Sequence, residues 1–172
     1  NLHTSVNPAG AIRGQITKLV ETLALSVEMN TQQEFPAPNL TNENGIGTGT
    51  ITAVVRRSAL GEVVGGTVTF TVNFNFNSEV RFNGLHIHEG GPGAPVGVVI
   101  NTGTSANNLI ISATGRGTVN IPVEITANSL PAFRRLLINP TGFYVNIHTS
   151  VNPGGVIRGQ LTRFSVPPLL QA

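Results

Sequence analysis

A strict alternation of apolar and polar residues runs from residue 67 to residue 77. Valine or phenylalanine occupies every second position, and threonine or asparagine fills the positions between (apolar: Val68, Phe70, Val72, Phe74 and Phe76). Because side chains of a β-strand point alternately to opposite faces, this segment has one apolar and one polar face. Such a strand is typical of an antiparallel sheet with one side against a core and the other in water.

The rest of the chain fits the same class. Apolar alternation and β-branched runs predict further strands over residues 18–29, 45–55, 96–100, 109–111, 119–125 and 143–149. Residues 30–44 are polar and contain prolines, so we expect a loop there. One helix is expected over residues 129–138, with Ser129 as its N-cap and Pro131 in its first turn. We therefore predict an all-β fold, an antiparallel, Greek-key-like β-sandwich or flattened barrel with one short helix.

An internal repeat constrains the domain organisation. Residues 1–17 read NLHTSVNPAGAIRGQIT and residues 146–162 read NIHTSVNPGGVIRGQLT, so the two copies differ at only four positions. The offset of 145 residues is the size of a domain, which favours an array of whole domains over a solenoid. We expect residues 1–19 to be the terminal β-hairpin of a preceding repeat, or a donated strand segment. Residues 20–165 would then be one domain and residues 166–172 a C-terminal tail.

Composition excludes several classes of function. Only 10% of the residues are charged and the formal net charge is +2, with no cluster of Lys or Arg, so neither nucleic acid nor an anionic membrane is an expected partner. The absence of Cys excludes a disulfide framework, a thiolate metal site and a thiol nucleophile. No apolar run reaches the ~18 residues of a membrane span. Low charge without Cys favours an exported β-protein.

Three of the four histidines occupy strand positions from which they can meet. His86 and His88 are two residues apart and share one face of a strand, while His148 lies on the polar face of the strand over 143–149. If these strands are neighbours, three imidazoles converge into a donor set suited to copper or zinc. Alternatively, the histidines only hydrogen-bond to turn carbonyls. Glu89 is either a fourth ligand, a partner of a ligand, or a solvated side chain.

Other candidate chemistry is sparse. Arg158 follows a turn in the segment 152–160 and lies between a β-branched residue and glycine. Its guanidinium either guards an anion site, caps turn carbonyls or pairs with Glu89. No GxSxG sequence, phosphate-binding loop, HExxH sequence or carboxylate pair stands out. No catalytic residue is assigned, and a non-enzymatic role is favoured over an enzymatic one.

Taken together, these motifs resemble those of the chordin-type (CHRD) domain family. The resemblance rests on the HIHEG sequence with its Gly/Pro turn, and on a last strand with His-Thr before the ending Gly-Gly-x-Ile-Arg-Gly-Gln-Leu. It covers about residues 23–164, and residues 1–19 match the end of a preceding copy. The family is found in secreted and surface proteins, often in tandem. The resemblance therefore implies export and repetition more than any reaction.

A weaker similarity exists to copper/zinc superoxide dismutases, which also have an HxH strand, a later ligand histidine and a Gly-rich turn with an arginine. It implies a superoxide-dismutase-like fold in which His86, His88 and His148 are copper ligands and Arg158 guides an anion. The bridging histidine, the His/Asp zinc loop and the cysteine pair of that family are missing from this sequence.

These observations lead to two hypotheses from different classes. The first is a secreted or surface-displayed structural module, the repeat unit of a tandem array or extracellular fibre, which pairs with copies of itself or neighbouring repeats through residues 1–17. It would carry a copper or zinc site of His86, His88 and His148. The second is a copper-binding, dismutase-like redox protein. Carbohydrate or matrix binding through the Thr/Asn face is a third possibility, but with no Trp and one Tyr the chain lacks the aromatics usual for sugar stacking.

Overall fold

The structure is a computed structural model that describes residues 2–10, 12–13, 20–39 and 43–164. The expected tail over 166–172 and the first two residues of the strand expected over 18–29 lie outside the described residues. The elements are β1 (Val20–Asn30), η1 (Thr31–Gln33), β2 (Gly45–Arg57), β3 (Val63–Phe76), β4 (Val80–Glu89), β5 (Val98–Asn101), β6 (Ile110–Ser112), β7 (Arg116–Glu124), α1 (Leu130–Ile138), η2 (Pro140–Gly142), β8 (Phe143–Thr149) and β9 (Ile157–Arg163).

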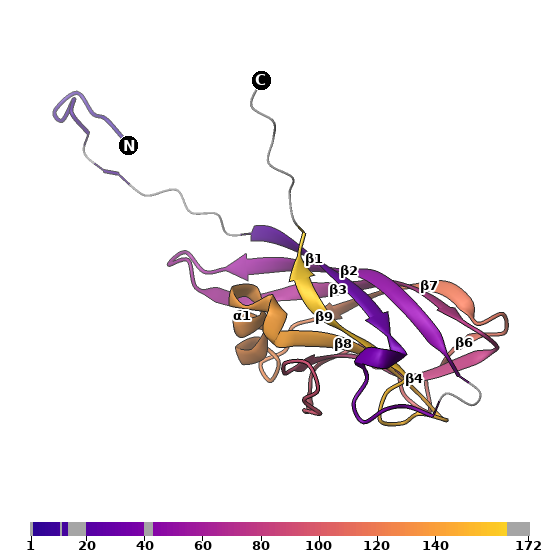
Figure 1. Cartoon of the computed structure of the whole chain (residues 1–172). Helices are drawn as coiled ribbons and strands as arrows, with labels where there is room; N and C mark the ends of the chain where they lie inside the picture. Colours follow the sequence, from indigo (N-terminus) through magenta and orange to yellow (C-terminus); the bar gives the residue numbers. More distant parts are fainter. Residues whose placement is uncertain (1, 11, 14–19, 40–42, 165–172) are drawn as a thin grey trace, which may run out of the picture.

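The strands form one sheet in the order β5-β4-β8-β9-β1-β2-β3-β7, and β6 also pairs with β4. Each of these pairings is antiparallel. The sheet curls into a flattened, nearly closed barrel, with α1 covering one end (Figure 1). The chain crosses over between β3 and β4 and again between β7 and β8, as Greek-key sheets do. The predicted all-β class is confirmed.

The alternating segment predicted over 67–77 lies almost entirely in β3, the longest strand. Its apolar residues point into the core, where Val68, Phe70 and Val72 are fully buried. Its polar residues form cross-strand pairs with β7 on the outer face: Thr118 donates to Asn73 at 2.6 Å, and Asn120 donates to Thr71 at 3.0 Å. The predicted division into one dry and one wet face is therefore present in the sheet.

The helix α1 forms where it was expected, and it buries Phe133 and Leu136 against the barrel. Ser129 occupies the N-cap position, but its hydroxyl makes no capping hydrogen bond to the helix. Instead it accepts a hydrogen bond from the backbone N–H of Thr126 at 3.0 Å, because the preceding turn folds back on it. In its described residues, 30–39 and 43–44, the loop expected over 30–44 contains a 3₁₀ turn, η1, at whose start the Asn30 side chain accepts from the N–H of Gln33. So short a turn leaves no periodic signal in the sequence.

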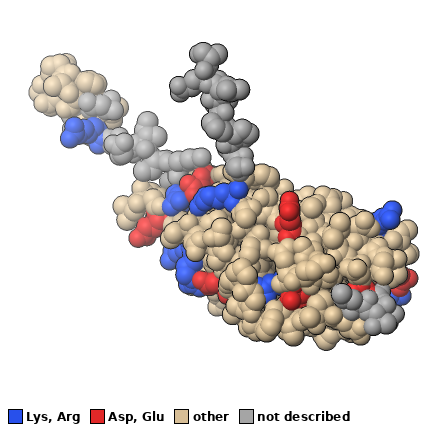
Figure 2. All heavy atoms as spheres, in the orientation of Figure 1, with Lys and Arg blue, Asp and Glu red and all other residues tan. Residues whose placement is uncertain are grey.

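The described residues of the first repeat copy, 2–10 and 12–13, form a small hairpin apart from the barrel (Figures 1 and 2). Residues 1, 11 and 14–19 of the hairpin expected over 1–19 lie outside the described residues. Leu2 and Ile12 pair in an antiparallel bridge, and both side chains are 65% exposed. We call residues 2–10 and 12–13 the N-terminal hairpin. We call β8, β9 and the turn between them the C-terminal hairpin. No helix in the described part of the chain is long and apolar enough to cross a membrane.

Candidate metal centre

The topology brings the three predicted histidines together. β4 pairs with β8 in a register that places His86 opposite Asn146, and Gly84 opposite His148. The core-facing residues Leu85 and Ile147 are fully buried, which directs the histidines to the opposite face of both strands. One ring nitrogen from each histidine lies within 4.8 Å of the other two.

Two of the histidines are oriented by backbone carbonyls. The Nδ1 of His88 is 2.7 Å from the carbonyl oxygen of Val96, and the Nδ1 of His148 is 3.0 Å from that of Pro153. A carbonyl only accepts hydrogen bonds, so Nδ1 carries the proton in both rings and each Nε2 keeps a lone pair. Such carbonyl partners are the usual means of fixing the tautomer and direction of a metal-binding histidine.

One ring nitrogen of each histidine has no hydrogen-bond partner. These atoms are buried, and they are Nδ1 of His86, Nε2 of His88 and Nε2 of His148. Leaving a buried acceptor unpaired costs about 1–3 kcal/mol, so three such atoms in one place form a candidate ligand set. A cation that accepts all three lone pairs would satisfy them at once, and copper and zinc both bind imidazole.

Burial keeps these rings uncharged at neutral pH. Burial, together with the like charge of the neighbouring His148 and His88, lowers the pKa of His86 to about 4. Burial also lowers the pKa values of His88 and His148, although the hydrogen bonds to Val96 and Pro153 act in the opposite direction. The lone pairs needed for metal ligation are therefore free of protons under ordinary conditions.

A glycine makes room for the cluster. A Cβ atom on Gly84 would lie 2.7 Å from Cε1 of His86 and 3.1 Å from Cβ of His148. Both distances are too short for ordinary packing, so a larger residue would force the two rings apart. Sequence reasoning missed this role, although a glycine inside a strand, two residues before a histidine, is a recognisable sign of close approach.

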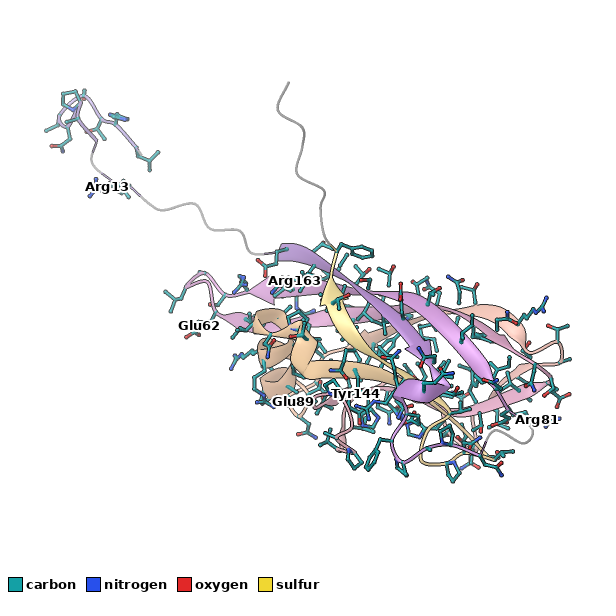
Figure 3. The ribbon with its side chains drawn as sticks, in the orientation of Figure 1. Arg13, Glu62, Arg81, Glu89, Tyr144 and Arg163 are labelled. Atoms are coloured by element: carbon teal, nitrogen blue, oxygen red, sulfur yellow. The ribbon has the colours of Figure 1, made fainter. Side chains whose placement is uncertain are left out.

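The side of the cluster near His88 is closed by the Gly/Pro turn that follows β4. Tyr144 stacks on His88 with ring centroids 4.8 Å apart, and the guanidinium of Arg158 lies 3.6 Å from the centroid of the same tyrosine. Arg158 donates to the carbonyl oxygens of Gly91 at 3.0 Å and Ala94 at 3.4 Å. Tyr144 lies inside the body (Figure 3) and also donates to Ala94.

These contacts decide between the roles considered for Arg158. Its side chain is 1% exposed and caps turn carbonyls, as one of the three hypotheses proposed. A role in guiding anions is not favoured, because the guanidinium is enclosed by the turn and the tyrosine ring. The expected alternative of a pair with Glu89 is wrong. Glu89 accepts two hydrogen bonds from Arg135, each 2.6 Å long, because α1 packs beside the end of β4.

Glu89 is neither a ligand nor a partner of a ligand in this structure. It is absent from the group of three side chains with converging donor atoms, and its carboxylate points toward α1. The hydrogen bonds from Arg135 lower its pKa, so it remains ionised. Glu89 therefore forms a surface ion pair outside the cluster.

Two buried carboxyl groups near the C-terminal hairpin were not foreseen. Glu34 accepts a hydrogen bond from Asn146 at 3.4 Å, and burial raises its pKa to about 7. Glu43 accepts hydrogen bonds from Thr149 and, at 3.0 Å, from Asn152. Asn146 lies on the same strand face as His148, and this position could have identified it from the sequence as a neighbour of the cluster. The two glutamates come from a loop without sequence periodicity, so the sequence gives no sign that they are buried.

A family model described as CHRD domain matches residues 25–161, which includes all three histidines of the cluster. No curated protein matches the chain, and no solved structure matches it.

Proposed function

The chain belongs to the CHRD-domain family, and from this premise we propose that it is a secreted or surface-displayed structural module that binds copper or zinc through His86, His88 and His148. Family membership is consistent with an extracellular module. The observation that carries the metal site is the set of three buried imidazole nitrogens, one from each histidine of the cluster, that have no hydrogen-bond partner.

The residues around the cluster have separable tasks in this proposal. Val96 and Pro153 orient two ligand rings through their carbonyl oxygens, and Gly84 leaves the space in which the rings meet. A bound ion would supply a positive charge shared by three uncharged nitrogens and would join β4 to β8. Because the unfolded chain has no such site, binding stabilises the folded state by mass action.

The dismutase-like alternative is not favoured. It requires Arg158 to attract an anion toward the metal, whereas the structure commits this guanidinium to the carbonyl oxygens of Gly91 and Ala94. Nothing in the arrangement of the three histidines requires redox chemistry. We therefore assign the site a structural role.

The proposed module also assembles with copies of itself or with neighbouring repeats through residues 1–17. Three observations support this part of the proposal. The segment repeats the sequence of the C-terminal hairpin, its described apolar side chains Leu2, Val6 and Ile12 are exposed, and the sheet has two terminal strands, β5 and β7. Most of the face seen in Figure 2 is uncharged, which suits contact between modules in an array or fibre.

Elemental analysis tests the metal site. The purified chain is loaded separately with copper and with zinc, dialysed, and compared with a His86→Ala/His88→Ala variant. We expect about one ion per wild-type chain with at least one of the metals, and none in the variant. Glu89→Ala is the matched control on the same strand, and it should retain the ion. Failure of the wild-type chain to retain either metal would refute the proposed site.

A further inference from the structure

The two copies of the repeat adopt the same turn, although only one of them is packed in the barrel. In the N-terminal hairpin the N–H of Thr4 donates to the carbonyl of Asn7 at 3.3 Å, and the N–H of Asn7 donates to the Thr4 hydroxyl at 3.0 Å. In the C-terminal hairpin, Thr149 and Asn152 make the same two hydrogen bonds at 3.2 and 3.0 Å. The turn geometry is therefore encoded locally.

His3 is held in the same way as His148. Its Nδ1 lies 2.7 Å from the carbonyl oxygen of Pro8, which is the counterpart of Pro153 in the repeat. The glycine that follows also matches, with φ of 112° at Gly10 and 125° at Gly155. His3 thus has the tautomer and the free Nε2 that make His148 a candidate ligand.

The two hairpins differ in the burial of their apolar side chains. Ile147 and Ile157 are fully buried in the barrel, whereas their counterparts Leu2 and Ile12 are each 65% exposed. A two-stranded hairpin is at best marginally stable alone in water. The N-terminal hairpin presents an exposed apolar face. The surface that fits this face is known, because the barrel buries the same face of the C-terminal hairpin.

The four differences between the copies keep this fit. Each exchanges one small or apolar residue for another: Leu2/Ile147, Ala9/Gly154, Ala11/Val156 and Ile16/Leu161. We propose that the N-terminal hairpin docks on a second CHRD body, in the place that the C-terminal hairpin holds here, and that His3 supplies the third imidazole of a metal site in that body. The metal half of this inference rests on the proposed function. The docking half deepens the proposed assembly through residues 1–17 and does not depend on the metal site.

The partner is a copy of this body whose own sequence stops before the C-terminal hairpin. Its equivalent of β4 would provide the two other histidines, and its equivalents of β4 and β1 would flank the docked hairpin as they flank β8 and β9 here. The partner's equivalent of Glu43 would accept a hydrogen bond from Asn7, as Glu43 does from Asn152.

A fusion protein tests both the docking of the N-terminal hairpin and the ligation of metal by His3. A second copy of residues 20–145 is placed directly before Asn1, so that residues 1–17 follow it as residues 146–162 follow it in the intact chain. We expect two protease-resistant bodies and twice the bound metal of the single chain after copper or zinc loading. His3→Ala should halve the metal bound by the fusion and leave the single chain unchanged.

A second variant separates docking from metal binding. In the fusion, Ile12→Asp should expose the added body to limited proteolysis, while the original body stays resistant. If the added body is digested in the fusion without this substitution, the docking is wrong. If both bodies resist digestion but His3→Ala does not change the amount of metal, His3 is not a ligand. If neither protein retains metal and both bodies resist digestion, docking stands while His3 ligation and the proposed metal function both fall.

Discussion

The N-terminal and C-terminal hairpins have almost the same sequence, yet their surroundings are opposite. Both make the same turn and hold their histidine through a proline carbonyl. In the C-terminal hairpin Arg158 is 1% exposed and caps a turn, whereas its counterpart Arg13 is exposed and lies outside the body (Figure 3). The hairpin sequence therefore specifies the turn, while the barrel supplies the burial, further hydrogen-bond partners and the other two proposed ligands.

The largest expected difference between the hairpins concerns metal affinity. His148→Ala removes one of three ligands, and we expect the affinity for copper or zinc to fall by more than about 100-fold, because even partners outside the ligand set cost about 10–100-fold. His3→Ala should leave the affinity of the single chain unchanged. Isothermal titration of both variants checks this. Equal effects of the two substitutions would contradict the comparison.

The next largest difference concerns packing. Ile157→Ala removes a fully buried side chain, which costs about 2–5 kcal/mol of unfolding free energy. Ile12→Ala changes a side chain that is 65% exposed, so we expect an effect within about 0.5 kcal/mol. Urea denaturation of the metal-free proteins measures both. A large loss for Ile12→Ala would mean that the N-terminal hairpin packs on its own barrel.

A smaller difference in stability is expected between substitutions of the turn asparagine, which is Asn7 in one hairpin and Asn152 in the other. Asn152 donates to the buried carboxylate of Glu43 at 3.0 Å, so Asn152→Ala removes a buried hydrogen bond to a charged group at a cost of about 1–3 kcal/mol. Asn7→Ala removes an exposed side chain and should change stability by less than about 0.5 kcal/mol. Thermal unfolding of the two variants measures both effects. Comparable losses of stability would contradict the expected difference between the hairpins.

The smallest effect is a pH dependence of the metal-free body. The folded-state pKa of His86, about 4, lies below its ordinary 6.5, so the unfolded chain binds more protons between these values and stability is lost as pH falls through this window. Glu34 acts oppositely. Its pKa is raised from 4.5 to about 7, so its contribution is complete below pH 4.5 and is lost as pH rises toward 7.

Burial lowers the pKa values of His88 and His148 as well, so Glu34 offsets part of the stability that the three histidines lose as pH falls. Glu34→Gln removes this offset, so we expect this variant to lose more stability than wild type between pH 6.5 and pH 5. Urea midpoints at the two pH values give the measurement. An identical loss in both proteins would show that Glu34 does not titrate in this window.

Much of this architecture could be predicted because it depends on local patterns. The alternation in β3 and the spacing of His86 and His88 fix strand faces directly, and the face of His148 follows from the strand over 143–149. That β4 and β8 are neighbours was a condition of the prediction, since pairing of distant strands has no local signal. The structure satisfies that condition.

The missed features come from contacts between distant segments. Glu34 and Glu43 lie in an aperiodic loop, and only the folded chain shows that both are buried beside the C-terminal hairpin. The choice of Arg135 over Arg158 as the partner of Glu89 depends on where α1 packs. Such choices follow from tertiary packing rather than from spacing along the sequence.

The most direct test of the central claim is a crystal structure of the copper- or zinc-loaded chain with anomalous data collected at the absorption edge of the metal. We predict one anomalous peak among Nδ1 of His86, Nε2 of His88 and Nε2 of His148, and no peak at His3 in the single chain. A peak at His3 with none in the cluster would contradict the account. So would a metal-loaded crystal in which the three rings remain without density between them.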